Sequence, residues 1–347
     1  MARRQTVHQL SPDALMKMIN DKWGPGTMRK ASDPALTIER IPCGILSIDY
    51  VMGGGFPRGR HVEIFGSYSV GKTYTAERLI ARSQDDGLRC AYIDVENTFD
   101  PDFAAHIGVD LEELSYHRQE HGNRVVDFIE TLLRSELYDV IVLDSIAALL
   151  PKSELESDME GGSYGTAQAK LMSAALRRLT AANKRTVLVY INQTRDSLGS
   201  VFQKRSVTSG GRAMGFYAGT RLEMVRVENI KRKVKQVDPA NGNEKVVELV
   251  RGHRVLVRVD KDKTGGARPH DSTTFVFDYE KREIDHIEDL MYLGRMLGLV
   301  EKRGDYWFVT DYEEEKQQGR ARFKKWLLHH PAICDELEES INGTIGE

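Results

Sequence analysis

Residues 66–73 read GSYSVGKT, which matches the pattern G-x-x-x-x-G-K-[ST]. The strand-like segment HVEIF at 61–65 precedes this stretch, and a helical pattern follows it. In such a strand–loop–helix, glycines let backbone N–H groups close around phosphate oxygens, and the helix N-terminus adds a site for an anion. The stretch therefore predicts a P-loop that binds a nucleotide. The residues expected to contact the nucleotide are Gly66, Ser67, Tyr68, Ser69, Val70, Gly71, Lys72, Thr73 and Tyr74.

Four residues would carry the chemistry of this loop. Lys72 would neutralise the β- and γ-phosphate oxygens, and Thr73 would offer its hydroxyl to Mg²⁺. The apolar run VIVL ends in Asp144, which is the form of a Walker B strand whose carboxylate holds the metal ion. Glu96 follows another apolar run and would activate the attacking water. Alone, either carboxylate could be an ordinary strand-end residue, but the P-loop favours the catalytic interpretation.

Apolar segments and helical patterns alternate along the middle of the chain. This alternation indicates βαβ units with helices on both faces of a sheet. The expected fold class is therefore α/β, with a mostly parallel twisted sheet that carries the P-loop. The predicted strands are 61–65, 90–95, 140–143 and 186–191, and the predicted helices are 73–83, 124–135 and 167–182.

Both ends of the chain depart from this alternation. Residues 13–21 form a helical pattern that stops near Gly24 and is too short to make a core, so we expect it to dock on another surface. A second helical unit begins near residue 285. The expected parts are an N-terminal docking element (1–35), a nucleotide-binding core (36–272) and a small C-terminal α+β domain (273–347).

Composition excludes several classes of protein. The 347 residues include 49 basic and 52 acidic ones, a formal net charge of −3, so any binding to nucleic acid must depend on local basic patches. The apolar runs are far shorter than the ~18 residues of a membrane span. Cys43, Cys90 and Cys334 form no CxxC motif, which argues against a disulfide framework or a cysteine zinc site and favours a reducing cytoplasm.

One local basic patch lies around residues 230–250. Two β-type segments flank the turn-forming sequence DPANGN and predict a hairpin. Alternation along a strand puts Lys231, Lys233 and Lys235 on one face. A solvated surface hairpin and a secondary DNA site both fit this pattern. Three arginines on flanking strands belong to the same candidate site, namely Arg226, Arg254 and Arg258.

Further motifs follow the P-loop in order. They are IDVENTFDP (93–101), DVIVLDSIAALLPKSELE (139–156), INQTR (191–195) and TSGGRAMGFYAGTRL (208–222). With this order and spacing the chain resembles the RecA recombinase family over about residues 13–342. The resemblance implies an ATPase core and an ATP- and Mg²⁺-dependent recombinase. It would polymerise as a helical filament on single-stranded DNA, with ATP at subunit interfaces, and exchange strands with duplex DNA in recombination and repair.

The resemblance also assigns roles by position. Gln193 would sense the γ-phosphate and couple it to DNA, and Asp100 and Phe103 would lie at the adenine. Lys261 and Lys263 would reach the ATP of the neighbouring subunit. On a strand both lysines point to one side, so their ammonium groups would converge like arginine fingers on the developing phosphoryl charge. A solvated lysine pair is the alternative.

Two loops, about 157–165 and 196–212, would line DNA in such a protein. The family inserts an apolar side chain from each loop between base triplets, and Tyr164 and Leu198 occupy those positions. An aromatic residue there could stack on bases. Amides and guanidinium groups would grip phosphates without reading sequence. These backbone-contacting positions are Ser173, Arg177, Gly210, Gly211 and Arg212.

The sequence departs from the family pattern in places, and rival interpretations exist. Gly215 stands where the family often has a basic residue, and the C-terminal tail is less acidic than in many relatives. A ring-shaped helicase motor and a catalytically silent DNA-coating protein would share parts of this pattern. The N-terminal helix and the C-terminal unit favour the filament, and the intact P-loop and acidic residues argue against a silent protein. Candidate partners include a single-strand-binding protein and loader proteins.

Overall fold

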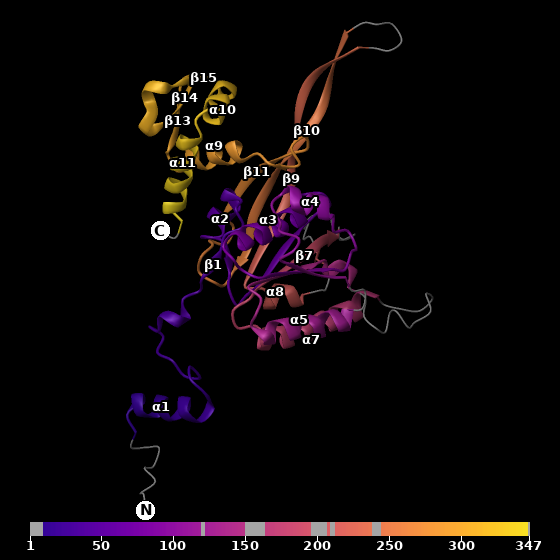
Figure 1. Cartoon of the computed structure of the whole chain (residues 1–347), viewed down its shortest axis with the longest axis vertical. Helices are drawn as coiled ribbons and strands as arrows, with labels where there is room; N and C mark the ends of the chain where they lie inside the picture. Colours follow the sequence, from indigo (N-terminus) through magenta and orange to yellow (C-terminus); the bar gives the residue numbers. More distant parts are fainter. Residues whose placement is uncertain are drawn as a thin grey trace, which may run out of the picture. The chain divides into compact units, whose positions relative to one another are not determined.

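The structure of the chain is a computed structural model that describes residues 10–118, 122–149, 164–195, 207–208, 212–237 and 244–345. The chain forms two compact units, Met1–Glu39 and Arg40–Glu347. Figure 1 colours them along the sequence from indigo to yellow. The second unit contains every segment that the sequence assigns to the sheet.

The first unit contains the helix expected near the N-terminus. Helix α1 (Pro12–Trp23) begins where Ser11 accepts a hydrogen bond from Ala14 N (3.3 Å), and it ends at Gly24. A 3₁₀ helix, η2 (Pro34–Leu36), follows. No residue of α1 is buried within the described chain. This exposure fits a helix that cannot form a core alone.

The second unit is built on a sheet of ten described strands. Their order is β12-β11-β10-β9-β3-β7-β6-β4-β5, and β8 pairs with β7. The strands from β9 through β3 to β5 pair in parallel, and β9 to β12 pair antiparallel. The expected α/β class with a mostly parallel sheet around the P-loop strand is confirmed. The strands are β3 (His61–Gly66), β4 (Cys90–Asp94), β5 (Leu114–Arg118), β6 (Val140–Asp144), β7 (Val187–Arg195), β8 (Val207–Thr208), β9 (Thr220–Val237), β10 (Glu244–Asp262), β11 (Ser272–Asp278) and β12 (Glu283–Ile284).

Helices cover both faces of this sheet (Figure 1). Strand β6 shows why its apolar run is continuous. Val140 and Val142 belong to one apolar cluster, and Ile141 and Leu143 belong to the cluster on the opposite face. The first cluster includes residues of α2 (Leu46–Val51), α3 (Lys72–Asp85) and α4 (Pro101–His106). The second includes residues of α5 (Gly122–Ser135), α7 (Tyr164–Ala182), α8 (Ala213–Tyr217) and the 3₁₀ helix η3 (Ile146–Ala148).

A C-terminal part has an apolar cluster of its own, which Leu46 of α2 joins. The buried carboxylate of Asp289 accepts a hydrogen bond from Ser47 N (3.0 Å), so this part is bonded to α2. Strand β11 crosses the expected boundary at 272/273 and belongs to the main sheet. The elements after β12 are α9 (His286–Met296), β13 (Val300–Arg303), β14 (Tyr306–Val309), η4 (Thr310–Glu315), β15 (Gln317–Gln318), α10 (Arg320–Leu328) and α11 (Pro331–Gly343), and the short pair β1 (Arg40–Ile41) and β2 (Phe56–Pro57) precedes the main sheet.

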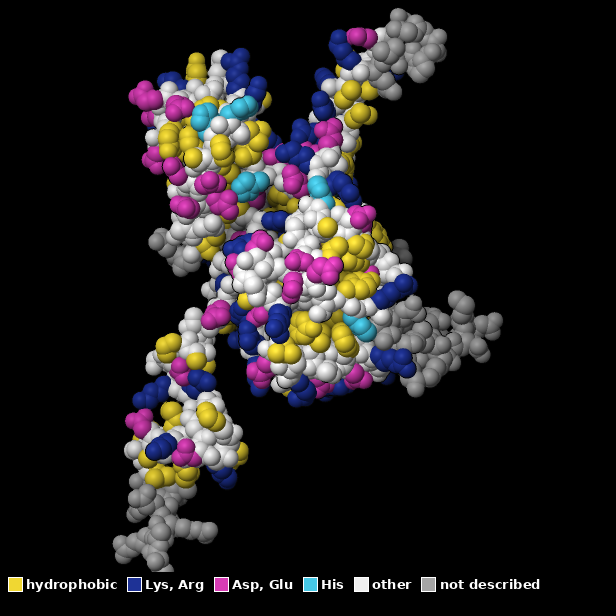
Figure 2. Space-filling view, in the orientation of Figure 1, with side chains coloured by type: hydrophobic (Ala, Val, Ile, Leu, Met, Phe, Trp, Pro, Cys, Tyr) yellow, Lys and Arg dark blue, Asp and Glu magenta, His cyan; other side chains and the backbone are white. Residues whose placement is uncertain are grey.

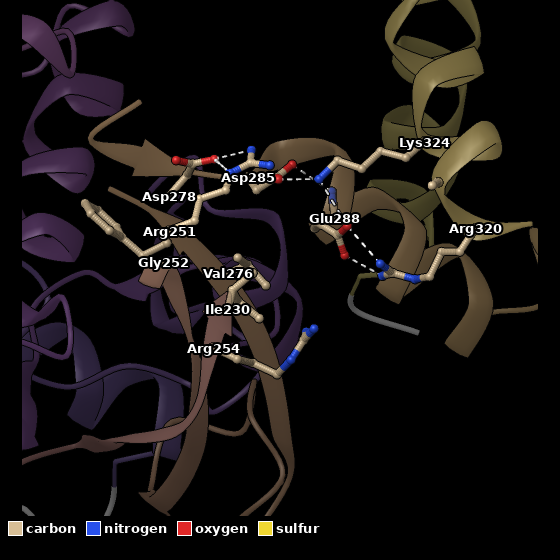
Figure 3. A pocket seen from close by; sticks show the side chains of 12 residues that line it. Ile230, Arg251, Gly252, Arg254, Val276, Asp278, Asp285, Glu288, Arg320 and Lys324 are labelled. Carbon is tan, nitrogen blue, oxygen red and sulfur yellow. Dashed lines mark hydrogen bonds and ion pairs between the residues drawn. The ribbon is translucent and has the colours of Figure 1, made fainter. Parts of the chain in front are cut away.

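A cavity of about 410 Å³ lies where β10 and β11 face α9 and α10 (Figure 3). Ion pairs hold its wall together. Lys324 of α10 bonds both Asp285 and Glu288, and Arg320 bonds Glu288. On the sheet side, Arg251 pairs with Asp278 (2.5 Å). The acids of this cavity are therefore neutralised by neighbouring cations.

The hairpin expected around 230–250 is the outer end of two long strands. β9 pairs with β3 only at residues 220–224, and β10 pairs with β11 only at residues 252–258. Beyond these points the two strands pair with each other among the described residues. Figure 1 shows the resulting ribbon extending from the sheet.

A buried histidine of the P-loop strand β3 forms hydrogen bonds with side chains of β7 and α7. His61 Nδ1 lies 2.9 Å from Tyr190 Oη, and His61 Nε2 lies 2.9 Å from Thr180 Oγ1. Burial lowers the pKa of His61 to about 4, from a usual value of about 6.5. The folded state therefore keeps this ring neutral at pH values where the unfolded chain binds a proton.

We expect His61→Gln to flatten the acid limb of the stability profile. The pKa difference of His61 contributes at most roughly 3 kcal/mol to the free energy of unfolding. This contribution is fully present above pH 6.5 and is lost as the pH falls towards 4. Denaturant unfolding of both proteins between pH 7 and pH 4 measures it. The free energy of unfolding should fall further for the wild type. Burial also raises the pKa values of Asp49 and Asp289 to about 6. Both proteins contain these two residues, so their contributions to the pH dependence cancel in the difference between the two profiles. Parallel profiles would contradict this prediction.

Candidate active site

The two glycines of the P-loop motif are required by different contacts. Gly71 has φ 90°, a left-handed conformation that side chains disfavour, immediately before α3 begins at Lys72. At Gly66 the backbone is ordinary, but an added Cβ would lie 2.1 Å from Met224 O of the neighbouring strand. Glycine at these two positions therefore allows the loop to turn tightly at the end of β3.

Lys72 lies at the centre of this loop. Its Nζ donates hydrogen bonds to Ser67 O (2.6 Å) and Gly66 O (3.3 Å). Burial lowers the pKa of this ammonium, although Asp144 and Glu96 oppose the effect. A partly desolvated cation held by carbonyl oxygens can gain by exchanging them for charged phosphate oxygens.

The expected metal ligands are adjacent. Thr73 Oγ1 donates to Asp144 Oδ2 (2.8 Å), and Tyr92 Oη donates to the same oxygen (2.8 Å). Burial raises the pKa of Asp144 to about 6, against the effect of both hydrogen bonds. A hydroxyl and a carboxylate are the oxygen ligands that Mg²⁺ prefers, and Mg²⁺ commonly uses one or two carboxylates together with substrate phosphates. The residues present therefore fit Mg²⁺.

Glu96 accepts hydrogen bonds from two donors, one on β7 and one directly after β6. Gln193 Nε2 donates to Glu96 Oε1 (3.0 Å), and Ser145 Oγ donates to the same oxygen. β4, β6 and β7 are parallel neighbours, so their carboxyl ends meet at one edge of the sheet. The structure thus brings together three segments that are far apart in the sequence.

Most of the predicted nucleotide-site residues line one cavity of about 340 Å³. Residues of the P-loop, both acidic strand ends and Gln193 all face it. It is also lined by one residue that the sequence did not single out, Ile191. The lining residues are Tyr68, Ser69, Val70, Gly71, Lys72, Thr73, Tyr74, Glu96, Asp144, Ile191 and Gln193.

The predicted adenine-contacting residues adjoin this cavity through Tyr74. The rings of Tyr74 and Phe103 lie 6.1 Å apart. Asp100 begins α4 by accepting a hydrogen bond from Phe103 N (3.1 Å). The guanidinium of Arg282 lies 4.9 Å from the Phe103 ring centre and 3.7 Å from Asp100 Oδ2. One face of the aromatic ring therefore stacks against Arg282 in this structure.

Lys261 and Lys263 do not line the cavity of their own chain. Lys261 Nζ donates to Gly215 O (2.7 Å), Phe216 O (3.3 Å) and Ala218 O (2.5 Å), where α8 ends. Burial lowers the pKa of Lys261 to about 8, and the nearby Lys263 ammonium adds to this effect. The side chain of Phe216, in the segment that Lys261 caps, is exposed.

Of the predicted DNA-contacting loop residues, three have described side chains. Ser173 Oγ donates to Ala169 O (2.8 Å) and Arg177 Nε to Ser173 O (3.2 Å) on α7, and Arg212 is exposed at the start of α8. Tyr164 begins α7, but its side chain lies outside the described residues. Most of both predicted loops also lies outside the described residues, including Leu198, Gly210 and Gly211.

The lysines of the hairpin are exposed and partly paired. Lys231 pairs with Glu248 (3.2 Å) and Lys235 with Glu244 (2.8 Å), whereas Lys233 makes no ion pair with a described residue. Exposed pairs of this kind contribute about 0–1 kcal/mol, so phosphates could displace them. Figure 2 shows Lys and Arg side chains along the hairpin beside hydrophobic ones.

Only one of the three arginines of the candidate hairpin site shares a face with these lysines. The strand register, with its bulges, places Arg226 on the lysine face and Arg254 and Arg258 on the opposite face. Arg254 pairs with Glu228 (3.3 Å), and Arg258 pairs with Glu223. The two groups of cations therefore point to different sides of the sheet.

Sequence reasoning missed two donors at the site. Tyr92 lies on β4, two residues before that strand ends, and Ser145 directly follows Asp144. Alternation along β4 could have placed Tyr92 on the same face as Asp94. Ser145 could have been proposed as a site residue because it directly follows the Walker B carboxylate of Asp144.

The comparisons with known proteins agree on one family. A family model described as the RecA N-terminal domain matches residues 11–258. The chain belongs to the RecA family. Protein RecA of Chloroflexus aurantiacus is 39% identical over 333 residues, which cover 94% of this chain and 89% of that protein. Protein RecA of Herpetosiphon aurantiacus is 38% identical over 331 residues (94% and 87%), and that of Bifidobacterium longum 36% over 350 residues (98% and 83%).

The match to RecA proteins includes the C-terminal part. The family model ends at residue 258, within β10, but the relatives cover 94–98% of this chain. The α/β sheet and the C-terminal part are thus the RecA fold in this chain. Among the described residues, no helix is long and apolar enough to cross a membrane.

Proposed function

We propose that the chain is an ATP-dependent DNA recombinase of recombination and DNA repair. It polymerises as a helical filament on single-stranded DNA and catalyses homologous pairing and strand exchange with duplex DNA. The observation that carries this proposal is the cavity in which Lys72, Thr73, Asp144, Glu96 and Gln193 meet, in a chain of the RecA family.

Within this proposal, each residue acts on ATP in a defined way. Lys72 and the P-loop amides bind the phosphates, and Thr73 and Asp144 hold Mg²⁺, which neutralises phosphate charge when bound. Glu96 takes a proton from the attacking water, and Gln193, bonded to Glu96, senses the γ-phosphate. Asp100 and Phe103 accommodate the base.

The proposal extends to partners and location. Helix α1, which has no buried residue, docks on the next subunit of the filament. Tyr164, Leu198 and the backbone-contacting residues around them bind single-stranded DNA. The protein works in the cytoplasm, with a single-strand-binding protein and loader proteins as further partners.

Electron microscopy with single-stranded DNA tests the filament. With a non-hydrolysable ATP analogue we expect continuous helical filaments, since nucleotide at each interface stabilises the polymer. A strand-exchange assay with labelled homologous duplex follows. Closed rings that move along DNA would favour a helicase motor instead, and coated DNA without ATP hydrolysis would favour a silent coating protein.

The interface site gives a separate prediction for Lys261. Lys261→Ala should leave ATP binding by the monomer nearly intact and reduce DNA-stimulated hydrolysis by about 100-fold or more, since removing a cation from developing phosphoryl charge has such effects. Lys263→Ala should act in the same direction. Steady-state ATP hydrolysis with and without single-stranded DNA measures both changes.

Mixing experiments distinguish an interface site from a damaged subunit. A Lys261→Ala protein and a Lys72→Ala protein each lack one half of the composite site. Mixed filaments contain some interfaces with both halves intact, so part of the hydrolysis should return. The absence of any recovery at every mixing ratio would contradict a composite site.

The hairpin gives a prediction for duplex capture. In a variant with Lys231, Lys233 and Lys235 all changed to Ala, filament formation and ATP hydrolysis on single strands should stay normal. Capture of duplex should weaken, with a salt slope lower by about 0.7–0.9 for each lost phosphate contact. The charge-matched control replaces three exposed lysines outside the hairpin: Lys184, Lys302 and Lys316. If both variants capture duplex equally across a salt series, the hairpin is a solvated surface ribbon and not a DNA site.

A further inference from the structure

A fully buried carboxylate lies beneath the P-loop, on the strand that leads into it. Glu63 of β3 has no exposed surface, although a charged carboxylate in an apolar interior is costly unless it is paired. Two partners satisfy it, an amide donor and one cation. Asn192 Nδ2 donates to Glu63 Oε1 (2.7 Å), and Arg221 Nε donates to Glu63 Oε2 (2.5 Å).

On one side, this carboxylate leads to the catalytic contact. Asn192 Oδ1 accepts a hydrogen bond from Gln193 N (2.9 Å), so the Asn192 side chain holds the peptide that carries Gln193. Gln193 in turn donates to Glu96 Oε1 (3.0 Å). Glu63 therefore fixes Asn192, and Asn192 fixes the backbone from which Gln193 reaches Glu96.

On the other side, Arg221 crosses the sheet to β10. Its Nη1 pairs with Asp260, and its guanidinium lies 4.5 Å from the Phe65 ring centre. The strand register places Glu63 opposite Arg221 and Arg221 opposite Lys261. These three residues thus form a row across β3, β9 and β10, and Lys261 caps the end of α8.

A purely structural ion pair would not need this arrangement. Apolar residues of similar volume often replace a buried pair without loss of stability. Here the polar contacts run without a break from Glu96 to Asp260, across four adjacent strands. One end, Glu96, is a group that the proposed function uses, and the other end, Asp260, directly precedes Lys261 on β10. The planar guanidinium of Arg221 bonds the carboxylates of Glu63 and Asp260 at the same time, and the ammonium of a lysine could not reproduce this geometry.

We propose that Asn192, Glu63 and Arg221 are positioning residues that hold Gln193 against Glu96 and tie this contact to Lys261 on the far strand. The inference rests on the proposed ATPase function. It assigns to the interior of one subunit the link between its own nucleotide cavity and the lysine that acts at its other interface.

Arg221→Lys tests the link with the least disturbance. It keeps a cation beside Glu63 but cannot bond both Glu63 and Asp260. We expect DNA-stimulated kcat for ATP to fall about tenfold while KM stays within about twofold, the signature of a contact used after binding. The matched control is Arg58→Lys, because the side chains of Arg58 and Arg221 are 17% and 16% exposed and Arg58 pairs with Asp139 at another part of the sheet.

A double-mutant cycle separates positioning from general destabilisation. In a Gln193→Ala background the residue to be positioned is absent, so Arg221→Lys should lower kcat by less than about twofold further. A tenfold fall in both backgrounds, or no fall in either, would overturn the proposal. So would an equal fall in the Arg58→Lys control. Denaturant unfolding of each variant, run in parallel, checks that the folded fraction is the same.

A second readout does not depend on activity. In nucleotide-free protein labelled with ¹⁵N-glutamine, the side-chain amide resonance of Gln193 is assigned by its loss in Gln193→Ala. It should shift in Arg221→Lys and stay in place in Arg58→Lys. If it stays in place in Arg221→Lys, the positioning role is wrong. If the wild type hydrolyses no ATP with DNA, the proposed function fails, and this resonance alone decides the positioning role.

Discussion

Lys72→Ala is expected to abolish nucleotide-dependent filament formation. The ammonium of Lys72 is the cation within the P-loop cavity, and its bonds to Gly66 and Ser67 are weak substitutes for charged phosphate oxygens. Two charge-assisted hydrogen bonds to phosphate contribute roughly 3–6 kcal/mol together, so ATP affinity should fall by more than about 100-fold. Fluorescent-nucleotide titration measures the affinity, and electron microscopy with single-stranded DNA shows the filaments.

The loss should not come from unfolding. Burial lowers the pKa of Lys72, which means that the folded state holds this charge at some cost. Removing it should leave the free energy of unfolding equal or slightly higher. Lys184→Ala, which removes an exposed cation paired with Glu136, is the matched control and should bind ATP normally. Tight ATP binding by the Lys72 variant would contradict the assignment of the cavity.

The local part of the site could be predicted because its rules are local. The P-loop motif fixes glycines, a lysine and a hydroxyl within eight consecutive residues, and a strand-like segment leads directly into it. The same holds for β6, where a fully buried run must end where solvent or a ligand begins, at Asp144. Parallel strands then bring their carboxyl ends together, so the position of Glu96 near Asp144 followed from the fold class.

The contacts between distant residues could not be predicted in this way. Gln193 lies 97 residues after Glu96, and only the resemblance to a family suggested a role for it. Tyr92 was missed because a tyrosine in an apolar strand also fits an ordinary core position. Glu63 was missed because its burial depends on Arg221, which comes from a strand 158 residues later.

The hairpin shows a different limit of sequence reasoning. Alternation correctly puts Lys231 and Lys233 on one face of β9, because no bulge interrupts that stretch. The three register shifts lie elsewhere, between Val250 and Gly252, between Arg254 and Val255, and between Val259 and Lys261. A bulge inserts an extra, unpaired residue and interrupts the alternation along the strand, so the facing of more distant arginines could not be counted from sequence.

Glu96→Gln is expected to separate ATP binding from hydrolysis. The glutamine keeps a side-chain oxygen that can accept the hydrogen bonds of Gln193 and Ser145, so the shape of the cavity should persist. It cannot take a proton from water. General-base catalysis contributes about 10²–10⁴-fold, and hydrolysis should slow by that factor while ATP affinity and filament formation on single-stranded DNA are retained.

The comparison with Lys72→Ala makes this result diagnostic. One variant should fail at nucleotide binding, whereas Glu96→Gln should bind ATP and form long-lived filaments, because in the proposed function hydrolysis permits release. Single-turnover hydrolysis of radiolabelled ATP, with filament lifetime followed by light scattering, measures both effects, and Glu113→Gln, an exposed glutamate before β5, serves as the control. Hydrolysis at the wild-type rate would remove Glu96 as the base and direct the search to another group on the cavity wall, since Asp144 already accepts hydrogen bonds from Thr73 and Tyr92.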